Sequence, residues 1–416
     1  MNVREASQRH LISRRAAALL LGSCMLAPSR ILAARSDRLT SDIVARSQLS
    51  SGDLGRLARV FAKARRGEPI RLGVIGGSIT VGAIASNPGN SYSGLLLAWW
   101  RERFPKCEID LINAGVGGTG SMYGALRAGR DLLSGTPDLV VIEFAVNDNW
   151  TDGEAYEGLV RQVLAQPNQP AVILLFMMWE RGGNDQEMQA KVGTHYNLPM
   201  ISFRDAMWPE MAAGRLKWSD YIVDTVHPND AGHAAAARFL TAMCETGMNA
   251  ATTKTFNAVD PLPPPLHSDA FQQVGWRDAA DLVPVENESW RQTVDDKSKP
   301  VWVGTPRAGR ISFDWLGTGL VAVFARPPDD RNRLRVCIDA ASFQTLDASI
   351  QPRRGIIILA EGLACGPHTV ELAALDDGGK PGTADDGVRL VGLGSIGLGS
   401  IGQGAGDSDI RRKREM

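Results

Sequence analysis

The sequence has few cysteines, almost no net charge and no long apolar run beyond residue 40. Its 45 Lys and Arg are balanced by 46 Asp and Glu, which gives a formal net charge of -1. A chain without an excess of basic residues is not built as a general nucleic-acid binder or for polybasic attachment to a membrane. No apolar run beyond residue 40 is long enough to span a bilayer. We therefore expect most of the 416 residues to fold in water.

Five cysteines provide neither a dense disulfide framework nor a zinc site. Cys24 lies in the N-terminal segment, and each half of the remaining chain has two more: Cys107 and Cys244, then Cys337 and Cys365. In an exported protein these can form one disulfide bridge per half, although four cysteines allow three pairings. No CxxC or Cys/His spacing matches a zinc site. We expect no metal and no other cofactor.

In residues 1–34 the charged residues and the apolar residues lie in separate stretches, as they do in export signals. Four arginines precede the short apolar run from Ala16 to Leu26. The segment "SRRAAALL" is similar to a twin-arginine signal, whereas "LGSC" resembles a lipoprotein processing box that would leave Cys24 lipidated. Both signal types stay open, as does an ordinary N-terminal helix. We predict an exported protein, periplasmic or secreted, that meets the membrane only if Cys24 carries a lipid.

The first half of the chain after this segment has the pattern of an α/β domain, which we place at 50–250. Apolar strand candidates such as "IRLGVIG" and "DLVVIEFAV" alternate with amphipathic helical segments such as "AYEGLVRQVLAQ". Strands that are apolar throughout are covered on both faces. Their alternation with helices is typical of a doubly wound parallel sheet, which binds ligands beyond the carboxyl ends of its strands.

In the second half of the chain, apolar and polar residues alternate with a period of two. In "ISFDWLG", apolar side chains alternate with polar ones, which places Trp315 in a core. Several half-buried strands of this kind predict an all-β sandwich over 269–400. The proline-rich stretch 259–268 is predicted to be an extended linker, and residues 401–416 a flexible tail.

Glycine-rich turns lie at the predicted strand ends of the α/β half. The segment "GVIGGSIT" has no lysine for a phosphate-binding loop. It meets the GxSxG serine elbow only in part, because Thr80 stands where the second glycine belongs. The segment "GVGGTG", from Gly115 to Gly120, matches GxGxxG but follows the second strand rather than the first. Taken alone, each turn is explained by a backbone that needs small residues.

Four separated stretches together point to acyl transfer. Ser78 follows the first strand, "NAGVGGTGS" the second and "EFAVNDN" the third, while "DTVHPNDAGH" opens a late helix. In order and spacing this set resembles the SGNH (GDSL-type) hydrolases over residues 70 to 245, which implies a flavodoxin-like sheet. The named positions of that family fall on Ser78, Gly118, Asn147 and His227, with Asp224 three residues before the histidine. One departure is Gly77, where the family usually has an aspartate that braces the turn.

The chemistry of these side chains fits a serine hydrolase. A serine hydroxyl attacks an ester only when a neutral imidazole takes its proton, as His227 can for Ser78. Asp224 can fix the tautomer of the ring and stabilise the imidazolium. The N–H groups of Ser78 and Gly118 and the side-chain amide of Asn147 would donate to the oxyanion.

Fold and family indicate acyl transfer but not the acyl group. Because predicted export and an attached β-sandwich are typical of enzymes that act on sugars, we predict a serine esterase that removes O-acetyl groups from a polysaccharide or oligosaccharide. Its partner would be an acetylated carbohydrate or another small acyl ester. An O-acetyltransferase acting on an exported polysaccharide and an inactive carbohydrate-binding protein stay open as alternatives.

The role of the sandwich also has two interpretations. It either holds polymer near the active site or packs on the α/β domain as a structural support. For the first role, Trp276, Trp290 and Trp302 are the candidates for a sugar-binding face.

Overall fold

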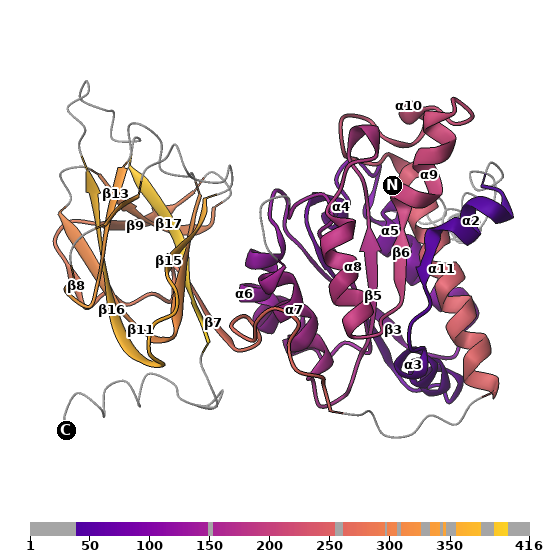
Figure 1. Ribbon diagram of the computed structural model, residues 1–416, viewed down its shortest axis with the longest axis horizontal. Coiled ribbons are helices and arrows are strands. Elements are labelled where there is room, and N and C mark those ends of the chain that lie inside the picture. The colour runs from indigo at the N-terminus through magenta and orange to yellow at the C-terminus, as the bar shows by residue number, and fades with distance from the viewer. Residues whose placement is uncertain are drawn as a thin grey trace, which may run out of the picture.

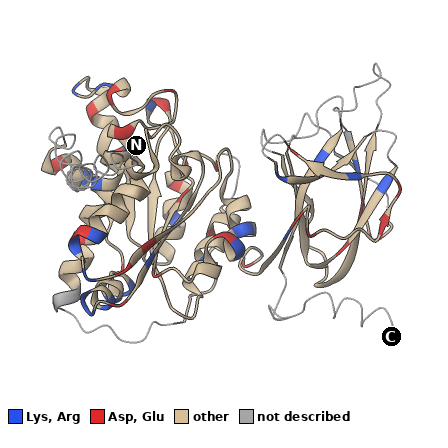
Figure 2. Ribbon diagram, turned by 180° about the vertical axis from the view of Figure 1, so that it is seen from behind, with Lys and Arg blue, Asp and Glu red and all other residues tan. Residues whose placement is uncertain are grey.

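The structure, a computed structural model, has an α/β domain followed by a β domain (Figure 1). It describes residues 39–148, 153–253, 261–295, 298–305, 309–325, 333–341, 344–346, 355–375 and 387–397. The export signal, Cys24 and the tail lie outside these residues and stay predictions. None of the described helices is both long enough and apolar enough to cross a bilayer. Positive and negative side chains are interspersed over both domains (Figure 2).

The α/β domain is built on a six-stranded sheet of order β1-β6-β5-β4-β2-β3. Its strands are β1 (Gln48–Ser50), β2 (Ile70–Gly76), β3 (Ile109–Gly115), β4 (Leu139–Glu143), β5 (Ala171–Phe176) and β6 (Met200–Ser202). Strands β2 to β6 run parallel, and β1 joins β6 antiparallel. The parallel strands have the flavodoxin-like order, which confirms the predicted fold class. The order reverses between β2 and β4, where sheets of this kind bind ligands beyond the strand ends.

Helices cover both faces of this sheet, and β4 and β5 are therefore buried at every position. One face packs against α3 (Gly55–Arg65), α5 (Tyr92–Arg103) and α11 (Asp230–Thr253). The other packs against α6 (Ser121–Asp131), α7 (Glu154–Leu164) and α8 (Gln186–His195). The domain also contains α2 (Ser41–Ser47), α9 (Phe203–Ala212), α10 (Trp218–Tyr221), η1 (Pro88–Asn90), η2 (Leu133–Gly135) and η3 (Glu180–Gly182).

Two antiparallel sheets form the β domain, which confirms the predicted sandwich. One has the order β15-β12-β17-β10-β9, with β7 also paired to β17, and the other the order β14-β13-β16-β11-β8. Phe313 and Trp315 point into the core between them, as the period-two pattern predicts. The strands are β7 (Val274–Asp278), β8 (Glu286–Asn287), β9 (Arg291–Val294), β10 (Pro300–Gly304), β11 (Arg310–Gly317), β12 (Gly319–Phe324), β13 (Arg333–Ile338), β14 (Gln344–Leu346), β15 (Ile356–Ala360), β16 (Gly366–Leu375) and β17 (Val388–Ile396).

The two domains share an apolar core. Phe271, Val321 and Ile396, from the second half of the chain, are buried in the same cluster as residues of α6 and α7. Gly158 of α7 lies directly against Phe271, since a Cβ added at Gly158 would be 2.3 Å from the Cβ of Phe271. The contact buries apolar surface of both domains, which favours the structural-support interpretation of the sandwich.

The segment between the domains is docked on α7. Glu157 accepts hydrogen bonds from the backbone N–H groups of Leu266, His267 and Ser268 at 2.5, 2.7 and 3.3 Å. Arg161 donates to the carbonyl of Pro263 at 2.8 Å. The described part of the predicted linker, 261–268, is therefore held along its length rather than being a free spacer.

The three tryptophans that are candidates for a sugar-binding face pack against other parts of the protein. Trp290 is only 3% exposed and lies in the sandwich core. Trp302 packs against the same core and donates to the carbonyl of Ala279. Trp276 meets Tyr123 of α6 edge-on, with 5.3 Å between the ring centroids. These three candidates therefore do not form one exposed aromatic face, because Trp290 is buried in the sandwich core, Trp302 packs against that core and Trp276 lies at the domain contact.

The disulfide bridges that the sequence allows, one in each half, are not formed in the structure. Cys107, Cys244, Cys337 and Cys365 are not bonded to one another. Cys107 donates to the carbonyl of Glu68, and Cys337 and Cys365 likewise donate to main-chain carbonyls. Cys244 is fully buried in the α/β core. Each thiol is accommodated by its own surroundings rather than by another cysteine.

Substitution of Phe271 tests the shared core. Phe271→Ala leaves a cavity against Gly158, and we expect it to lower the free energy of unfolding by about 3–5 kcal/mol in urea titrations of the full chain. Val294→Ala, at a position 57% exposed in the β domain, is the control and should change it by less than ~0.5 kcal/mol. Wild-type stability of Phe271→Ala would contradict a shared core.

Candidate active site

Two glycines place Ser78 at the end of β2. Ser78 opens the short helix α4 (Ser78–Val81) directly after the strand. A Cβ at Gly76 would lie 2.1 Å from Oγ1 of Thr80, and a Cβ at Gly77 would lie 2.2 Å from Oδ1 of Asn147. The serine turn is therefore packed against the end of β4. The aspartate usual in the family has no room at Gly77, because Asn147 occupies that space.

Ser78, His227 and Asp224 form one hydrogen-bonded chain. Nε2 of His227 lies 2.9 Å from Oγ of Ser78, and Nδ1 lies 2.7 Å from Oδ2 of Asp224. Burial alone would raise the pKa of Asp224, but hydrogen bonds from His227 and from the N–H of Val226 outweigh it and lower the pKa to about 2. An ionised Asp224 holds the ring proton on Nδ1, which leaves Nε2 to accept the proton of the serine.

The loop that carries Asp224 and His227 is fixed by its own main chain and by its neighbours. The N–H of Val223 donates to the carbonyl of His227 at 2.9 Å. The ring N–H of Trp218 donates to the carbonyl of Asp224 at 2.7 Å. Asn229 then caps the start of α11, since its side-chain oxygen accepts from two backbone N–H groups of the first turn. The loop holds its two side chains on one side, as the DxxH spacing predicts.

Gly118 and Asn147 lie at the neighbouring strand ends. Gly118 has φ +77°, in the left-handed region that favours glycine. The turn after β3 runs close to the serine, because a Cβ added at Gly117 would be 3.7 Å from the Cβ of Ser78. Asn147 follows β4 and touches the position of Gly77. The structure thus gathers all five predicted site residues at one edge of the sheet, and the oxyanion roles stay predictions.

A buried glutamate supports the serine turn from below. Glu143, the last residue of β4, is fully buried and accepts a hydrogen bond from Oγ1 of Thr80 at 3.0 Å. Thr80 is also hydrogen-bonded to the hydroxyl of Tyr92 at 2.9 Å. Burial raises the pKa of Glu143 to about 8, so the carboxyl is protonated at neutral pH. Thr80, which breaks the GxSxG pattern, is thus a partner of this acid.

Asp148 holds the turn that presents Asn147. It is 2% exposed, and it accepts from the N–H of Ser121 at 2.7 Å and from the amide of Gln189 at 2.8 Å. Burial raises the pKa of Asp148 to about 7. The residue next to Asn147 is therefore anchored to α6 and α8 at once, which fixes the Asn147 main chain.

Arg127 of α6 ties together the ends of β2 and β3. It is fully buried and donates to the carbonyls of Ala114 at 2.6 Å and Gly76 at 3.4 Å. Asp131 pairs with it at 3.2 Å. The sequence gives no direct signal for this role, because an arginine on an amphipathic helix is usually solvated.

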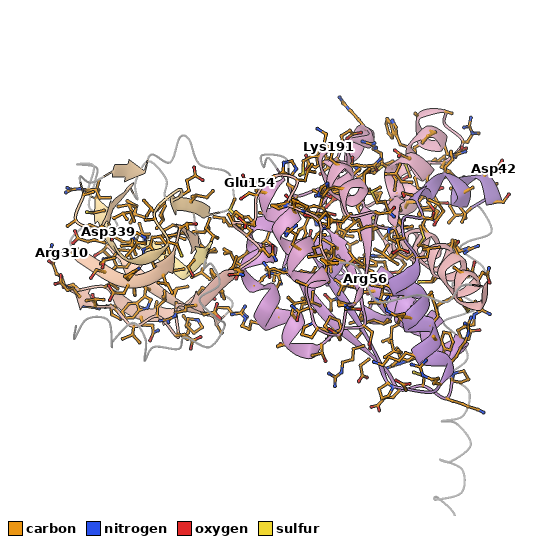
Figure 3. All side chains as sticks on the ribbon, turned by 60° about the horizontal axis from the view of Figure 1, so that its bottom comes forward. Asp42, Arg56, Glu154, Lys191, Arg310 and Asp339 are labelled. Carbon is orange, nitrogen blue, oxygen red and sulfur yellow. The ribbon has the colours of Figure 1, made fainter. Side chains whose placement is uncertain are left out.

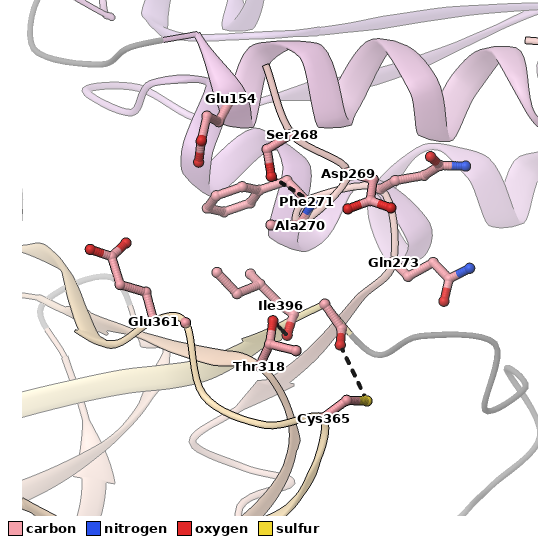
Figure 4. A pocket seen from close by; sticks show the side chains of 13 residues that line it. Glu154, Ser268, Asp269, Ala270, Phe271, Gln273, Thr318, Glu361, Cys365 and Ile396 are labelled. Atoms are coloured by element: carbon pink, nitrogen blue, oxygen red, sulfur yellow. Dashed lines mark hydrogen bonds between the residues drawn. The ribbon is translucent and has the colours of Figure 1, made fainter. Parts of the chain in front are cut away.

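A cavity of about 750 Å³ lies between the two domains. Glu154, labelled near the domain junction in Figure 3, faces Glu361 of the β domain across it (Figure 4). The lining contains none of Ser78, Asp224 and His227, so the cavity and the hydrogen-bonded chain are separate features. In the part of the chain that the structure describes, no cluster of three His, Cys, Asp or Glu side chains is placed to hold a metal ion.

Residues 74–235 match the model of the GDSL-like Lipase/Acylhydrolase family. The α/β domain is a GDSL-like hydrolase domain. Across both domains the chain is similar to a two-domain esterase active on acetylated mannans, with a TM-score of 0.75 in two crystal structures. The structure co-crystallised with mannopentaose is 28% identical, and the match covers 86% of this chain and 98% of that one. The second is 29% identical and covers 86% and 99%. No curated protein matches the sequence.

Glu143 gives the GDSL-like domain a testable pH dependence of stability. In the unfolded chain a glutamate titrates near ~4.3, whereas folding raises the pKa of Glu143 to about 8. The stability contributed by the protonated form is complete below the unfolded value and is lost as pH rises through the folded one. Glu143→Gln keeps an acceptor for Thr80 and cannot ionise.

Between pH 5 and 8, we expect the melting temperature of the wild type to fall more steeply than that of Glu143→Gln. Glu102→Gln, which changes an exposed glutamate of α5, is the control and should follow the wild type. Parallel curves for wild type and Glu143→Gln would contradict the protonated state of this acid.

Proposed function

We propose that this chain is a serine esterase that removes O-acetyl groups from a polysaccharide or oligosaccharide outside the cytoplasm. The observation that carries the proposal is the continuous chain from Asp224 through His227 to Ser78, in a GDSL-like hydrolase domain. Similarity across both domains to an esterase active on acetylated mannans supports an acetylated carbohydrate as the substrate. Acetylated mannan is the first candidate.

In this mechanism Nε2 of His227 takes the proton of Ser78 as Oγ attacks the acetyl carbonyl. Asp224 holds the ring and stabilises the imidazolium. The oxyanion of the tetrahedral intermediate accepts from the N–H groups of Ser78 and Gly118 and from the amide of Asn147, each worth ~3 kcal/mol in the transition state.

Collapse of the intermediate breaks the bond to the sugar oxygen, which takes the proton from His227 and leaves. The acetyl group is then an ester of Ser78. A water molecule, deprotonated by His227, attacks this ester, and acetate departs as Oγ regains its proton. Each proton removed by the histidine is returned in the following step, so the enzyme is regenerated.

The proposal is tested by acetate release from acetylated mannan, acetylated xylan and 4-nitrophenyl acetate. We expect the wild type to act on all three or on mannan and the small ester. Ser78→Ala and His227→Ala should each lower kcat by at least ~10³-fold on every substrate, because triad members act as a unit. The readout is acetate release at saturating substrate.

His368→Ala is the matched control, since it removes a histidine of the β domain that is hydrogen-bonded to Asp339. It should retain wild-type kcat. Activity of the wild type on 4-nitrophenyl acetate but on neither glycan would contradict the carbohydrate substrate. Full activity of Ser78→Ala would contradict the serine mechanism itself.

A further inference from the structure

Three exposed apolar side chains lie in the two segments that carry the triad. Val81 and Ile84 follow Ser78 and are 49% and 51% exposed, and Val223, directly before the aspartate of the triad, is 60% exposed. Among the described residues of 39–253, the one other exposed large apolar side chain is Leu49, and at 39% it is less open to solvent than these three. None of the three joins the apolar clusters of the domain. Packing therefore does not account for them.

Ile84 also has a strained backbone. Its φ is +68°, and for a β-branched residue the left-handed region is an outlier that costs on the order of 1–3 kcal/mol. The turn around it is closed by backbone hydrogen bonds from Ala83 to Ser78 and from Ala85 to Gly82. Gly or Asn would adopt this conformation more easily. An exposed isoleucine here reduces stability without adding to the core.

The strained segment is held by the helix that follows His227. His233 of α11 lies with Nε2 at 3.3 Å from the carbonyl of Ala83. Asp230 accepts from both the N–H and the hydroxyl of Ser86 at 2.8 Å. The position of Ile84 is therefore fixed relative to the serine and the histidine, which lets a strained conformation persist.

We infer that Ile84, with Val81 and Val223, forms an apolar rim that contacts the sugar ring bearing the ester. The acetyl group has to reach Oγ of Ser78 and the backbone donors beside it. Half-exposed side chains on the rim can touch only the part of the substrate that stays outside, which is the alcohol. The C–H face of a sugar ring suits apolar side chains of this kind. The inference rests on the proposed function, because it takes a carbohydrate as the alcohol.

Two substitutions separate substrate contact from a structural role. Ile84→Gly and Ile84→Asn both permit the left-handed backbone, so we expect melting temperatures equal to or above that of the wild type. We expect KM for an acetylated manno-oligosaccharide to rise about fivefold or more, the scale of removing an apolar contact. Values of kcat, and KM for 4-nitrophenyl acetate, should be unchanged, because the small ester has no sugar ring.

Gln169→Gly is the matched control. Gln169 has φ +51° and lies before β5, at the edge of the sheet opposite the active site, so this change relieves a comparable strain away from the substrate. It should leave both KM values unchanged. Three results would contradict the sugar contact. They are a wild-type KM for the oligosaccharide in both Ile84 variants, an equal rise of KM for 4-nitrophenyl acetate, and a melting temperature of these variants below that of the wild type.

The outcomes also separate this inference from the proposed function. If the wild type releases no acetate from any acetylated glycan, the proposal of a carbohydrate substrate is contradicted, and the inference of an apolar rim is contradicted with it. If the wild type cleaves the oligosaccharide and the Ile84 variants bind it equally well, only the rim fails.

Discussion

The 2.9 Å hydrogen bond between His227 and Ser78 is the contact on which the rest of the structure depends. It joins the end of β2 to a loop near the end of the α/β domain, so both segments have to be held in place. Gly76 and Gly77 allow the serine turn to press against β4. The carboxylate of Asp224 fixes the other end, by holding the ring and the main chain of His227 together.

A series of contacts connects the serine turn with the β domain. Arg127 binds the carbonyl of Gly76 and pairs with Asp131, which also pairs with Arg130. Arg130 reaches Asp278 in β7 of the β domain. This series of charged contacts, together with the shared apolar core, ties the second domain to the helix that braces the serine. The sandwich is thus part of the support of the site, whatever else it binds.

The sequence predicts the parts of this protein that depend on local patterns. Apolar runs such as Leu139–Ile142 indicate buried parallel strands, and a period of two indicates the sandwich. Asp224 and His227 are recognisable because a DxxH turn is a short-range feature. Their partner Ser78 needs the order of several motifs, since glycines and a serine after a strand are equally explained by a simple turn.

The remaining features arise from contacts between distant segments, which no local pattern specifies. Arg127 and Glu143 are ionisable residues in a helix and a strand with no unusual sequence pattern, and only the fold shows that both are buried against the serine turn. A proline-rich segment indicates extension, but Glu157 of a distant helix decides that it is docked. From the sequence Trp290 is a candidate sugar contact, but in the structure it is buried in the core of the sandwich. Predictions fail here because burial is a property of the assembled chain.

Trapping of the acyl-enzyme tests the central claim most directly. The full chain is mixed with 4-nitrophenyl acetate, quenched in acid within the first turnovers, digested and analysed by mass spectrometry. The account predicts one acetyl group on the peptide that contains Ser78, assigned to the serine by fragmentation, and none in Ser78→Ala. Acetate release by the wild type without acetylation of Ser78, or with the acetyl group on another residue, would contradict it.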